Sequence, residues 1–235
     1  IVESEGQALL KELGASASLC IADLVDPASP KKIAAACVAA FGRIDSLVNC
    51  AAIFDQSNIE NITYENYQRM MQINLNAPLF LIQACFPELK KNRGAVLNIG
   101  SVNAHAGEAN LLSYSMSKGA MVTMTRNLGN ALGVTGVRVN QINPGWILTD
   151  REKRMKIEQG LGDEWWLKQS KMDVPSGTMT TPEQLAEIQR LKALMQQPAT
   201  EAQRRAQAIW NAEQIANRNQ PPGKAKGGSA RDKAL

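Results

Sequence analysis

A tyrosine and a lysine four residues apart, Tyr114 and Lys118, are the residues of this chain best suited to acid–base chemistry. Positions four apart lie on one face of a helix, so the phenol and the ammonium group would share a site. A nearby cation favours phenolate and lowers a tyrosine pKa from its ordinary value of about 10. Tyr114 could then exchange a proton with an alcohol, while Ser101, at the end of an apolar run upstream, could hold the same substrate oxygen.

A Tyr-x-x-x-Lys pair is a weak motif by itself, because such pairs also occur by chance. Here it stands in order with other segments, namely residues 47–52, 71–78, 96–101 and 137–149. In kind, order and spacing they resemble the short-chain dehydrogenase/reductase family, over about residues 6–186. The resemblance implies an oxidoreductase that uses NAD or NADP and acts on a secondary alcohol or its ketone.

The resemblance assigns a role to each position that matches the family's motifs. Tyr114 would donate or accept the proton, Lys118 would lower its pKa and bind the nicotinamide ribose, and Ser101 would orient the substrate. Asn74 would be a fourth catalytic residue that supports a water relay to the lysine. The other cofactor-binding positions would be Asp23 for the adenine amino group, Asn49 and Ala51 along the cofactor channel, and Pro144, Gly145, Ile147 and Thr149 around the nicotinamide.

Several of these positions also have an ordinary structural explanation. Asn74 could be a polar residue inside a helix, and Asp23 could be a turn residue. Ala52 stands where the family usually has glycine, so cofactor contact there is open to question. We expect plain structural roles for the neighbouring residues: a small buried side chain for Cys50, helix positions for Ser113, Ser115 and Ser117, and a wall residue for His105.

Length and composition fit one α/β domain, because 235 residues with 44% hydrophobic content can bury a substantial core. No apolar run approaches the ~20 residues of a membrane span, and no charged-then-apolar leader opens the chain. Scattered cysteines without C-x-x-C spacing and a single histidine argue against a metal site. We therefore expect a cytoplasmic protein with reduced thiols and no membrane contact.

Helix and strand patterns alternate along the chain, which predicts a Rossmann-like, doubly wound parallel sheet. We expect helices over residues 3–13, 29–41, 63–91 and 112–132, and strands over residues 18–22, 46–49, 95–99 and 137–142. Pro144 and Gly145 then follow the last strand at the carboxyl edge, where open α/β sheets bind ligands.

The resemblance is incomplete at both ends. The family opens with a strand and a Gly-rich turn that holds the cofactor pyrophosphate, whereas this sequence starts at what looks like the third helix. The expected sheet therefore lacks the first two strands and also the last one. We expect the strand at 18–22 to dock directly on the strand at 46–49, because unpaired backbone groups are costly. Asp23 would then approach the pyrophosphate space and weaken dinucleotide binding.

We divide the chain into an incomplete dehydrogenase domain at 1–182, a helical extension at 183–218 and a disordered basic tail at 219–235. From residue 183 onward, basic residues exceed acidic ones by as much as the whole formal net charge of +4. Charge spread so thinly indicates a solvated end more than a nucleic-acid-binding surface. The extension carries one apolar stripe, made of Leu185, Ile188, Leu191, Leu194 and Met195.

Two functions stay open from the sequence alone. The first is a short-chain oxidoreductase, for which the polar residues between Ser101 and Tyr114 favour a hydroxylated substrate such as a sugar or hydroxy acid. The second is a non-catalytic remnant that binds a partner subunit but cannot hold a dinucleotide. The resemblance also implies a homodimer through the two long helices, whose available apolar side chains are Leu79, Phe80, Ile82, Phe86, Met121, Met124 and Leu128.

Overall fold

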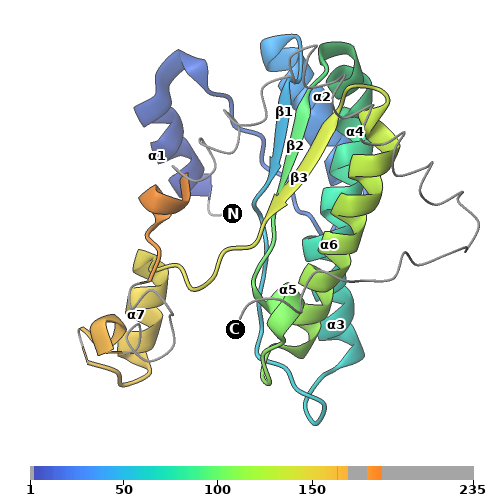
Figure 1. The fold of residues 1–235 in the computed structure, drawn as a ribbon. Helices are drawn as coiled ribbons and strands as arrows, with labels where there is room; N and C mark the ends of the chain where they lie inside the picture. The colour runs from blue at the N-terminus through green and yellow to red at the C-terminus, as the bar shows by residue number, and fades with distance from the viewer. Residues whose placement is uncertain (1–2, 163, 169–178, 187–235) are drawn as a thin grey trace, which may run out of the picture. The chain divides into compact units, whose positions relative to one another are not determined.

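A parallel sheet of three strands, in the order β1-β2-β3, forms the centre of the fold (Figure 1). Strand β1 (Ser46–Asn49) pairs with β2 (Ala95–Ile99), and β2 pairs with β3 (Arg138–Ile142). In the register, Val48 lies opposite Leu97, which lies opposite Asn140. Parallel neighbours need crossover connections, and helices supply them here. The prediction of a small, incomplete parallel α/β sheet is confirmed.

The computed structural model describes residues 3–162, 164–168 and 179–186. The chain divides into two units, Ile1–Leu185 and Ala186–Leu235, and every described residue except Ala186 belongs to the first. Most of the expected helical extension at 183–218, and all of the expected basic tail at 219–235, lie outside the described residues, so both stay predictions. None of the helices in the described part of the chain is long and apolar enough to cross a membrane.

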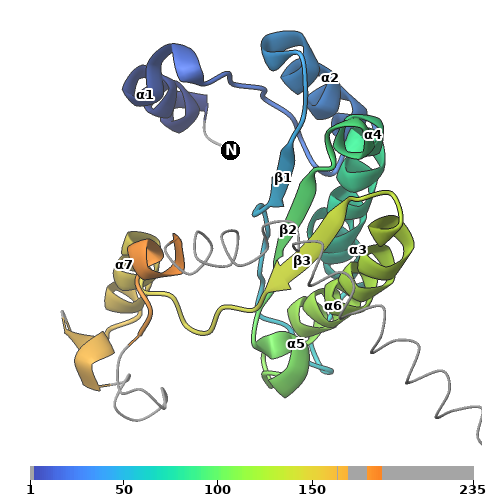
Figure 2. The ribbon, with the colours of Figure 1, turned by 45° about the horizontal axis from the view of Figure 1, so that its top comes forward.

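Helices cover one face of the sheet (Figures 1 and 2). Helix α2 (Ser29–Phe41) precedes β1, α3 (Tyr64–Met71) and α4 (Ala77–Asn92) connect β1 to β2, and α5 (Asn103–Ala106) and α6 (Leu112–Gly133) connect β2 to β3. Helix α1 (Glu3–Leu13) buries none of its residues, and α7 (Asp150–Glu158) follows β3. The core between the sheet and the helices contains Ala34, Ile44, Ile82, Cys85, Leu89, Val96 and Val137.

Local signals set most helix boundaries where the sequence predicts them. Helix α2 ends at Gly42, whose positive φ of 75° lets its N–H bond to the carbonyl of Val38. Helix α3 begins after Thr63, whose side chain accepts a hydrogen bond from the Asn66 N–H. A glycine is favoured at a left-handed C-cap because it has no Cβ, and threonine is a preferred N-cap.

The prediction of a single helix over residues 63–91 is wrong in one respect, because the structure has two α-helices there. A π-helical turn, Gln72–Asn76, separates α3 from α4, and the N–H of Ala77 bonds to the carbonyl of Gln72, five residues back. Pro78 supplies the physical reason, because it has no N–H to bond to the carbonyl of Asn74 four residues earlier. The helix therefore widens at Asn74, as π-bulges often do at functional sites.

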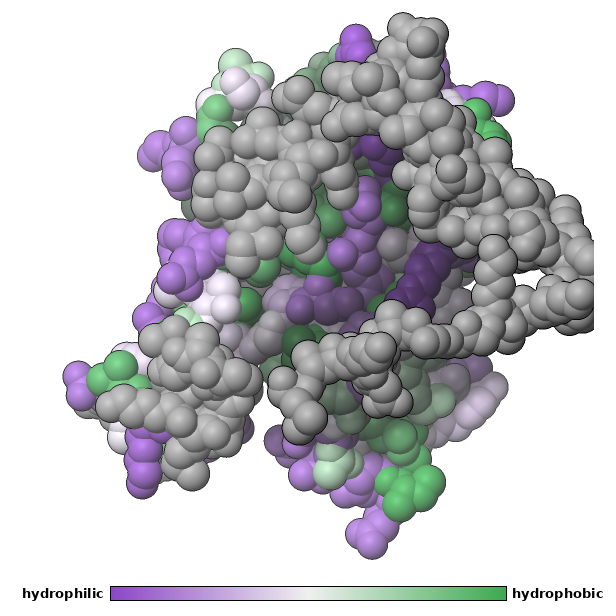
Figure 3. All heavy atoms as spheres, viewed as in Figure 1, coloured by the Kyte–Doolittle hydropathy of each residue, from purple (hydrophilic) through white to green (hydrophobic). Residues whose placement is uncertain are grey.

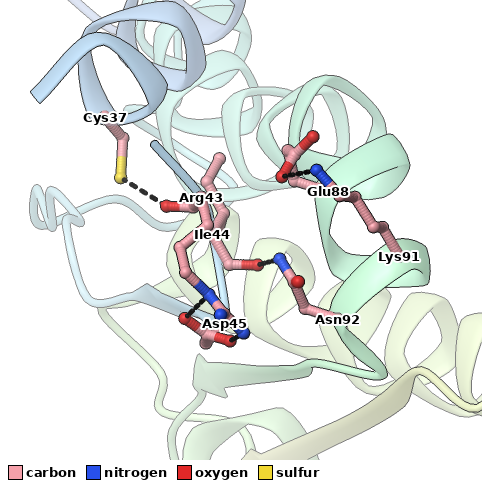
Figure 4. Close-up of polar contacts among 7 residues, drawn as sticks. All are labelled: Cys37, Arg43, Ile44, Asp45, Glu88, Lys91 and Asn92. Carbon is pink, nitrogen blue, oxygen red and sulfur yellow. Dashed lines mark hydrogen bonds and ion pairs between the residues drawn. The ribbon is translucent and has the colours of Figure 1, made fainter. Parts of the chain in front are cut away.

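The turn between α2 and β1 is fixed to the end of α4 (Figure 4). Asn92 Nδ2 donates to the carbonyl of Ile44 over 3.0 Å, and Arg43 pairs with Asp45 at 2.6 Å. At Gly94 the backbone passes so close that a Cβ would lie 2.5 Å from the carbonyl oxygen of Asp45. These contacts set where β1 starts, and therefore where its carboxyl end lies relative to β2.

The strand predicted at 18–22 does not form, and it does not dock on β1. A cavity of about 180 Å³ lies between Cys20, Ala22 and Leu24 on one side and the end of β1 on the other. The Ile21 carbonyl instead accepts a hydrogen bond from Lys32 Nζ at 2.8 Å, so this carbonyl is satisfied although its residue forms no strand. Strand β1 is consequently an edge strand, and Val48 is 54% exposed.

Candidate active site

Ser101, Tyr114 and Lys118 meet at the carboxyl end of β2. Ser101 follows Ile99, the last residue of β2, and Tyr114 and Lys118 lie in the first two turns of α6. Lys118 Nζ lies 5.7 Å from the centre of the Tyr114 ring and donates a hydrogen bond of 2.8 Å to the carbonyl of Ile99. The three residues that the sequence singles out therefore share one site.

Burial dominates the ionisation of this cluster. It raises the pKa of Tyr114 above its ordinary value, and the hydrogen bond with the Ser101 side chain offsets this only in part. It also lowers the pKa of Lys118 to about 8, against a smaller raising effect from Cys50. The direction is opposite to the lowered tyrosine pKa that the resemblance implies, because desolvation of the phenolate outweighs the hydrogen bond with Ser101.

Asn74 ties the loop after β1 to helix α6. Its side chain is fully buried, and its Oδ1 accepts from the N–H of Ile53 at 2.9 Å while its Nδ2 donates to the Ile53 carbonyl at 2.8 Å. Nδ2 also lies 3.2 Å from Ser117 Oγ, to which it donates. Asn74 is thus more than a polar residue in a helix: it is a buried tether beside the catalytic cluster. The water relay stays a proposal.

The serines around Tyr114 differ from the plain helix positions that we expect from the sequence. Ser117 is buried and donates to the carbonyl of Tyr114 at 2.7 Å. Ser113 is buried as well, and its Oγ lies 2.9 Å from Ser57 Oγ, a residue that the sequence gives no reason to select. Ser115 fits the expectation, since its hydroxyl has no partner. Serine is disfavoured in helix interiors, so three serines within five residues of the sequence were a signal that could have pointed to these contacts.

A row of hydrogen-bonded polar side chains crosses the strands near their carboxyl ends, and it is buried at Asn49, Asn98 and Thr125. Asn49 Nδ2 donates to Asn98 Oδ1 at 2.8 Å, and Asn98 Nδ2 donates to Thr125 Oγ1 at 2.9 Å. Thr125 bonds in turn to Gln141, which continues through Asn143 to His105. The amide of Asn49 is therefore engaged across the sheet, and sequence reasoning missed its partners because they lie on other strands.

The predicted cofactor-binding residues form two groups in the structure. Near the cavity beside β1, Asn49 and Ala51 are lining residues, and so is Cys50, which is exposed rather than buried as we expect from the sequence. Asp23 lies between two lining residues, and its Oδ1 accepts from the N–H of Val25 at 2.9 Å, which is a turn contact.

The second group follows β3. The Pro144 carbonyl accepts from the N–H of Val102 at 3.0 Å, which places Pro144 and Gly145 beside the loop that carries Ser101. Ile147 forms a parallel bridge with Thr180. Thr149 Oγ1 accepts from the Glu152 N–H at 3.1 Å and so caps α7. Among the described residues, no hydrogen bond joins Asp23, Ile147 or Thr149 directly to the catalytic cluster.

Comparison with known proteins gives a consistent result. A family model described as enoyl-(acyl carrier protein) reductase matches residues 2–191. The chain is 33% identical over 183 residues to the short-chain dehydrogenase/reductase FrzI of Cladobotryum, covering 76% of this chain and 69% of that protein. It is 36% identical over 135 residues to galactitol 2-dehydrogenase of Agrobacterium fabrum, covering 57% and 53%.

Solved structures agree. A protein from Beutenbergia cavernae, assigned as an NAD(P)-dependent gluconate 5-dehydrogenase and crystallised with bound NADP, superposes with a TM-score of 0.64 at 28% identity, covering 75% of this chain and 69% of that one. The chain spans only about half to two thirds of several curated relatives, for example 51% of a short-chain dehydrogenase from Penicillium rubens and 61% of an oxidoreductase from Thermotoga maritima. Since the family model matches most of its residues, this chain belongs to the short-chain dehydrogenase/reductase family.

Proposed function

We propose that this chain carries the catalytic part of an oxidoreductase that transfers a hydride between NAD or NADP and a secondary alcohol or its ketone. The observation that supports this most strongly is the buried cluster of Ser101, Tyr114 and Lys118 at the carboxyl end of β2. Family membership supports the same reaction class. The cytoplasmic location expected from the sequence stays a prediction.

Tyr114 exchanges the proton with the substrate oxygen. In the direction of reduction its phenol donates to the carbonyl oxygen, and in the direction of oxidation the phenolate accepts from the hydroxyl. The Ser101 hydroxyl, whose interaction with the phenol lowers the pKa of Tyr114 against the effect of burial, holds the same oxygen. Lys118, with a pKa of about 8, is largely protonated at neutral pH, so its charge stabilises the phenolate as it forms.

The residues present fit the nicotinamide end of the cofactor. The buried Lys118 amino group would bind the ribose, Asn49 and Ala51 would line the channel, and Pro144, Gly145, Ile147 and Thr149 would surround the ring. When bound, the nicotinamide supplies the hydride. The cavity beside β1, lined partly by Asn49 and Ala51, supports this placement. Asp23, beside the same cavity, would meet the adenine amino group.

A non-catalytic role is the second candidate, and the open edge of β1 favours it. The expected docking of residues 18–22 is absent, so β1 has no strand partner on its outer side among the described residues. A partner subunit could use the same edge. Titration of the chain with NADH and NADPH separates the two candidates, because the catalytic role requires saturable binding of one of them.

We further propose a polar, hydroxylated substrate. Polar residues stand beside the catalytic loop, where Asn143 Nδ2 lies 3.2 Å from His105 Nε2. Past Gly145, Trp146 packs 5.4 Å from Trp165, and its indole N–H donates to Glu152 Oε1 at 2.9 Å. Aromatic rings flanked by polar groups suit the mixed faces of a polyol. The galactitol and gluconate relatives support this proposal.

Replacing Tyr114 by phenylalanine tests the acid–base role. We expect turnover, followed by nicotinamide absorbance, to fall by about 10²-fold or more, because the proton donor is lost. Cofactor affinity, measured by fluorescence titration, should change little. Tyr64→Phe is the matched control, because Tyr64 is an exposed residue of α3. A Tyr114→Phe variant as active as the parent chain would exclude the proposed role.

The lowered pKa of Lys118 predicts a pH-dependent stability. Between pH ~8 and ~10.4 the unfolded lysine holds a proton that the folded one has lost, so the free energy of unfolding should rise with pH in that window, by up to about 3 kcal/mol. Below pH ~8 Lys118 is charged in both the folded and the unfolded chain, so the full free-energy cost of burying its charge lowers the stability of the fold. Urea unfolding between pH 7 and 9.5 should show this rise for the parent chain and for Lys90→Met, an exposed control, but not for Lys118→Met.

A substrate screen tests the proposed substrate class. Sugar alcohols, sugar acids and hydroxy acids should be oxidised with a kcat/KM at least ~10-fold above that for bulky apolar alcohols, the margin that unpaired polar groups in a site commonly produce. Tyr114→Phe serves as the blank for background reduction of the cofactor. Turnover of bulky apolar ketones alone would overturn this part of the proposal.

The homodimer stays a proposal, and fewer apolar side chains are available for it than the sequence suggests. Ile82 and Met121 are buried, and Phe86, Met124 and Leu128 pack against the same core, so these side chains serve the chain's own fold. Phe80 on α4 and Met116 on α6 are 46% and 47% exposed and remain available. Figure 3 shows a further apolar patch at the loop that joins β1 to α3.

A dimer through α4 and α6 should therefore depend on Phe80. Light scattering should give twice the chain mass for the parent protein, and Phe80→Glu should give a monomer, because it places a charge in an apolar contact. Val134→Glu is the control, since Val134 is exposed at the far end of α6. A parent chain that is monomeric at high concentration would contradict the proposal.

A further inference from the structure

Helix α6 begins without a cap of its own. The first N–H groups of a helix have no partner within it, and a side chain of the N-cap residue usually satisfies one of them. Here the N-cap residue is Leu111, which makes no such bond. Tyr114 is the third residue of α6, so whatever fixes this first turn also fixes the phenol.

Ser57, in the loop between β1 and α3, supplies the missing cap. Its carbonyl accepts from the N–H of Leu112 at 2.9 Å, and its Oγ accepts from the N–H of Ser113 at 3.3 Å. Its own N–H donates to the carbonyl of Asn110 at 2.9 Å. The cap therefore comes from a residue 56 positions before Ser113, by backbone and side chain together.

The two hydroxyls also pair with each other in a dry environment. Ser57 Oγ and Ser113 Oγ lie 2.9 Å apart, and the two residues are only 4% and 1% exposed. Removing the Ser57 hydroxyl leaves both the Ser113 hydroxyl and the Ser113 N–H without these hydrogen bonds, and a buried polar group without a partner is costly. Serine is therefore needed at this position for its oxygen, and not only for its small size.

The same loop holds Tyr114 at two further points. The Phe54 ring meets the Tyr114 ring edge-on, with centroids 6.4 Å apart. Ile53 is bound on both backbone groups by Asn74, which also donates to Ser117, one turn after Ser113. Residues 53–57 thus contact α6 before and at the tyrosine, and Asn74 connects them to the turn after it. We call this segment the clamp loop.

We propose that Ser57 is a positioning residue for Tyr114, an inference that rests on the proposed catalytic role of that tyrosine. By capping α6 from the clamp loop, Ser57 sets the first turn of the helix against β2 and so sets the distance from the phenol to Ser101 and Lys118. Rate depends steeply on such placement, because a displacement of about 1 Å can cost 10²-fold.

Ser57→Ala is the primary test, with Ser57→Thr and Ser115→Ala as matched controls. Threonine keeps the oxygen, and the Ser115 hydroxyl is buried without a partner, so its removal breaks no hydrogen bond. We expect Ser57→Ala to lower kcat about tenfold, which corresponds to about 1.4 kcal/mol, with KM nearly unchanged. Ser57→Thr should restore most of the rate, and Ser115→Ala should match the parent chain.

A readout independent of turnover keeps this inference separate from the proposed function. The chain has three tyrosines, so ring-labelled ¹³C tyrosine gives few NMR signals, and Tyr114→Phe assigns the one of interest. In Ser57→Ala the Tyr114 signal should move toward that of the exposed Tyr64, while both controls leave it in place. A chain that binds no cofactor would remove the proposed function, and the NMR result would still decide whether Ser57 positions Tyr114.

Ser113→Ala provides a second variant in case Ser57→Ala does not fold. It removes the same hydroxyl pair but keeps both backbone bonds to Ser57, so a smaller displacement of the Tyr114 signal in the same direction is expected. An unchanged Tyr114 signal in the folded variants would overturn the proposal. Equal loss of rate in Ser57→Ala and Ser115→Ala would overturn it too, because a general effect of lost serines would then explain the data.

Discussion

The buried amide of Asn74 is the interaction on which the rest of the site depends. It lies in the π-helical turn before Pro78, and it binds both backbone groups of Ile53. The geometry of one helix defect therefore places the clamp loop against α6, and α6 carries the tyrosine and lysine.

Burial shifts the pKa values of both Tyr114 and Lys118 and makes their charged forms less stable. It raises the pKa of Tyr114, which keeps the phenol neutral, and it lowers the pKa of Lys118 to about 8, which still leaves the lysine largely charged at neutral pH. A proton transfer to substrate creates a phenolate, and the lysine charge then has a partner at short range. The site is thus poorly stabilised at rest and better stabilised as charge develops, which is the condition for catalysis by electrostatics.

Sequence reasoning succeeds where the signal is local and fails where the partner is distant. Gly42 ends α2 as predicted because a left-handed C-cap needs glycine, and the alternation of helices and strands gives the parallel sheet. Ser57 has no local signal, since its partner lies 56 residues away. Residues 18–22 have a strand-like composition, yet a strand needs a neighbour, and none of the described strands lies beside them.

The proposed cofactor channel and the open edge of the sheet lie at the same surface. Parallel sheets are usually covered on both faces, yet the described helices that pack on this sheet cover one, and Leu97 in the central strand is only half-buried. The edge of β1, with Val48 exposed, borders the cavity in which Asn49 and Ala51 would line the cofactor channel. Any segment that completes the sheet at β1 would therefore also form a wall of the channel.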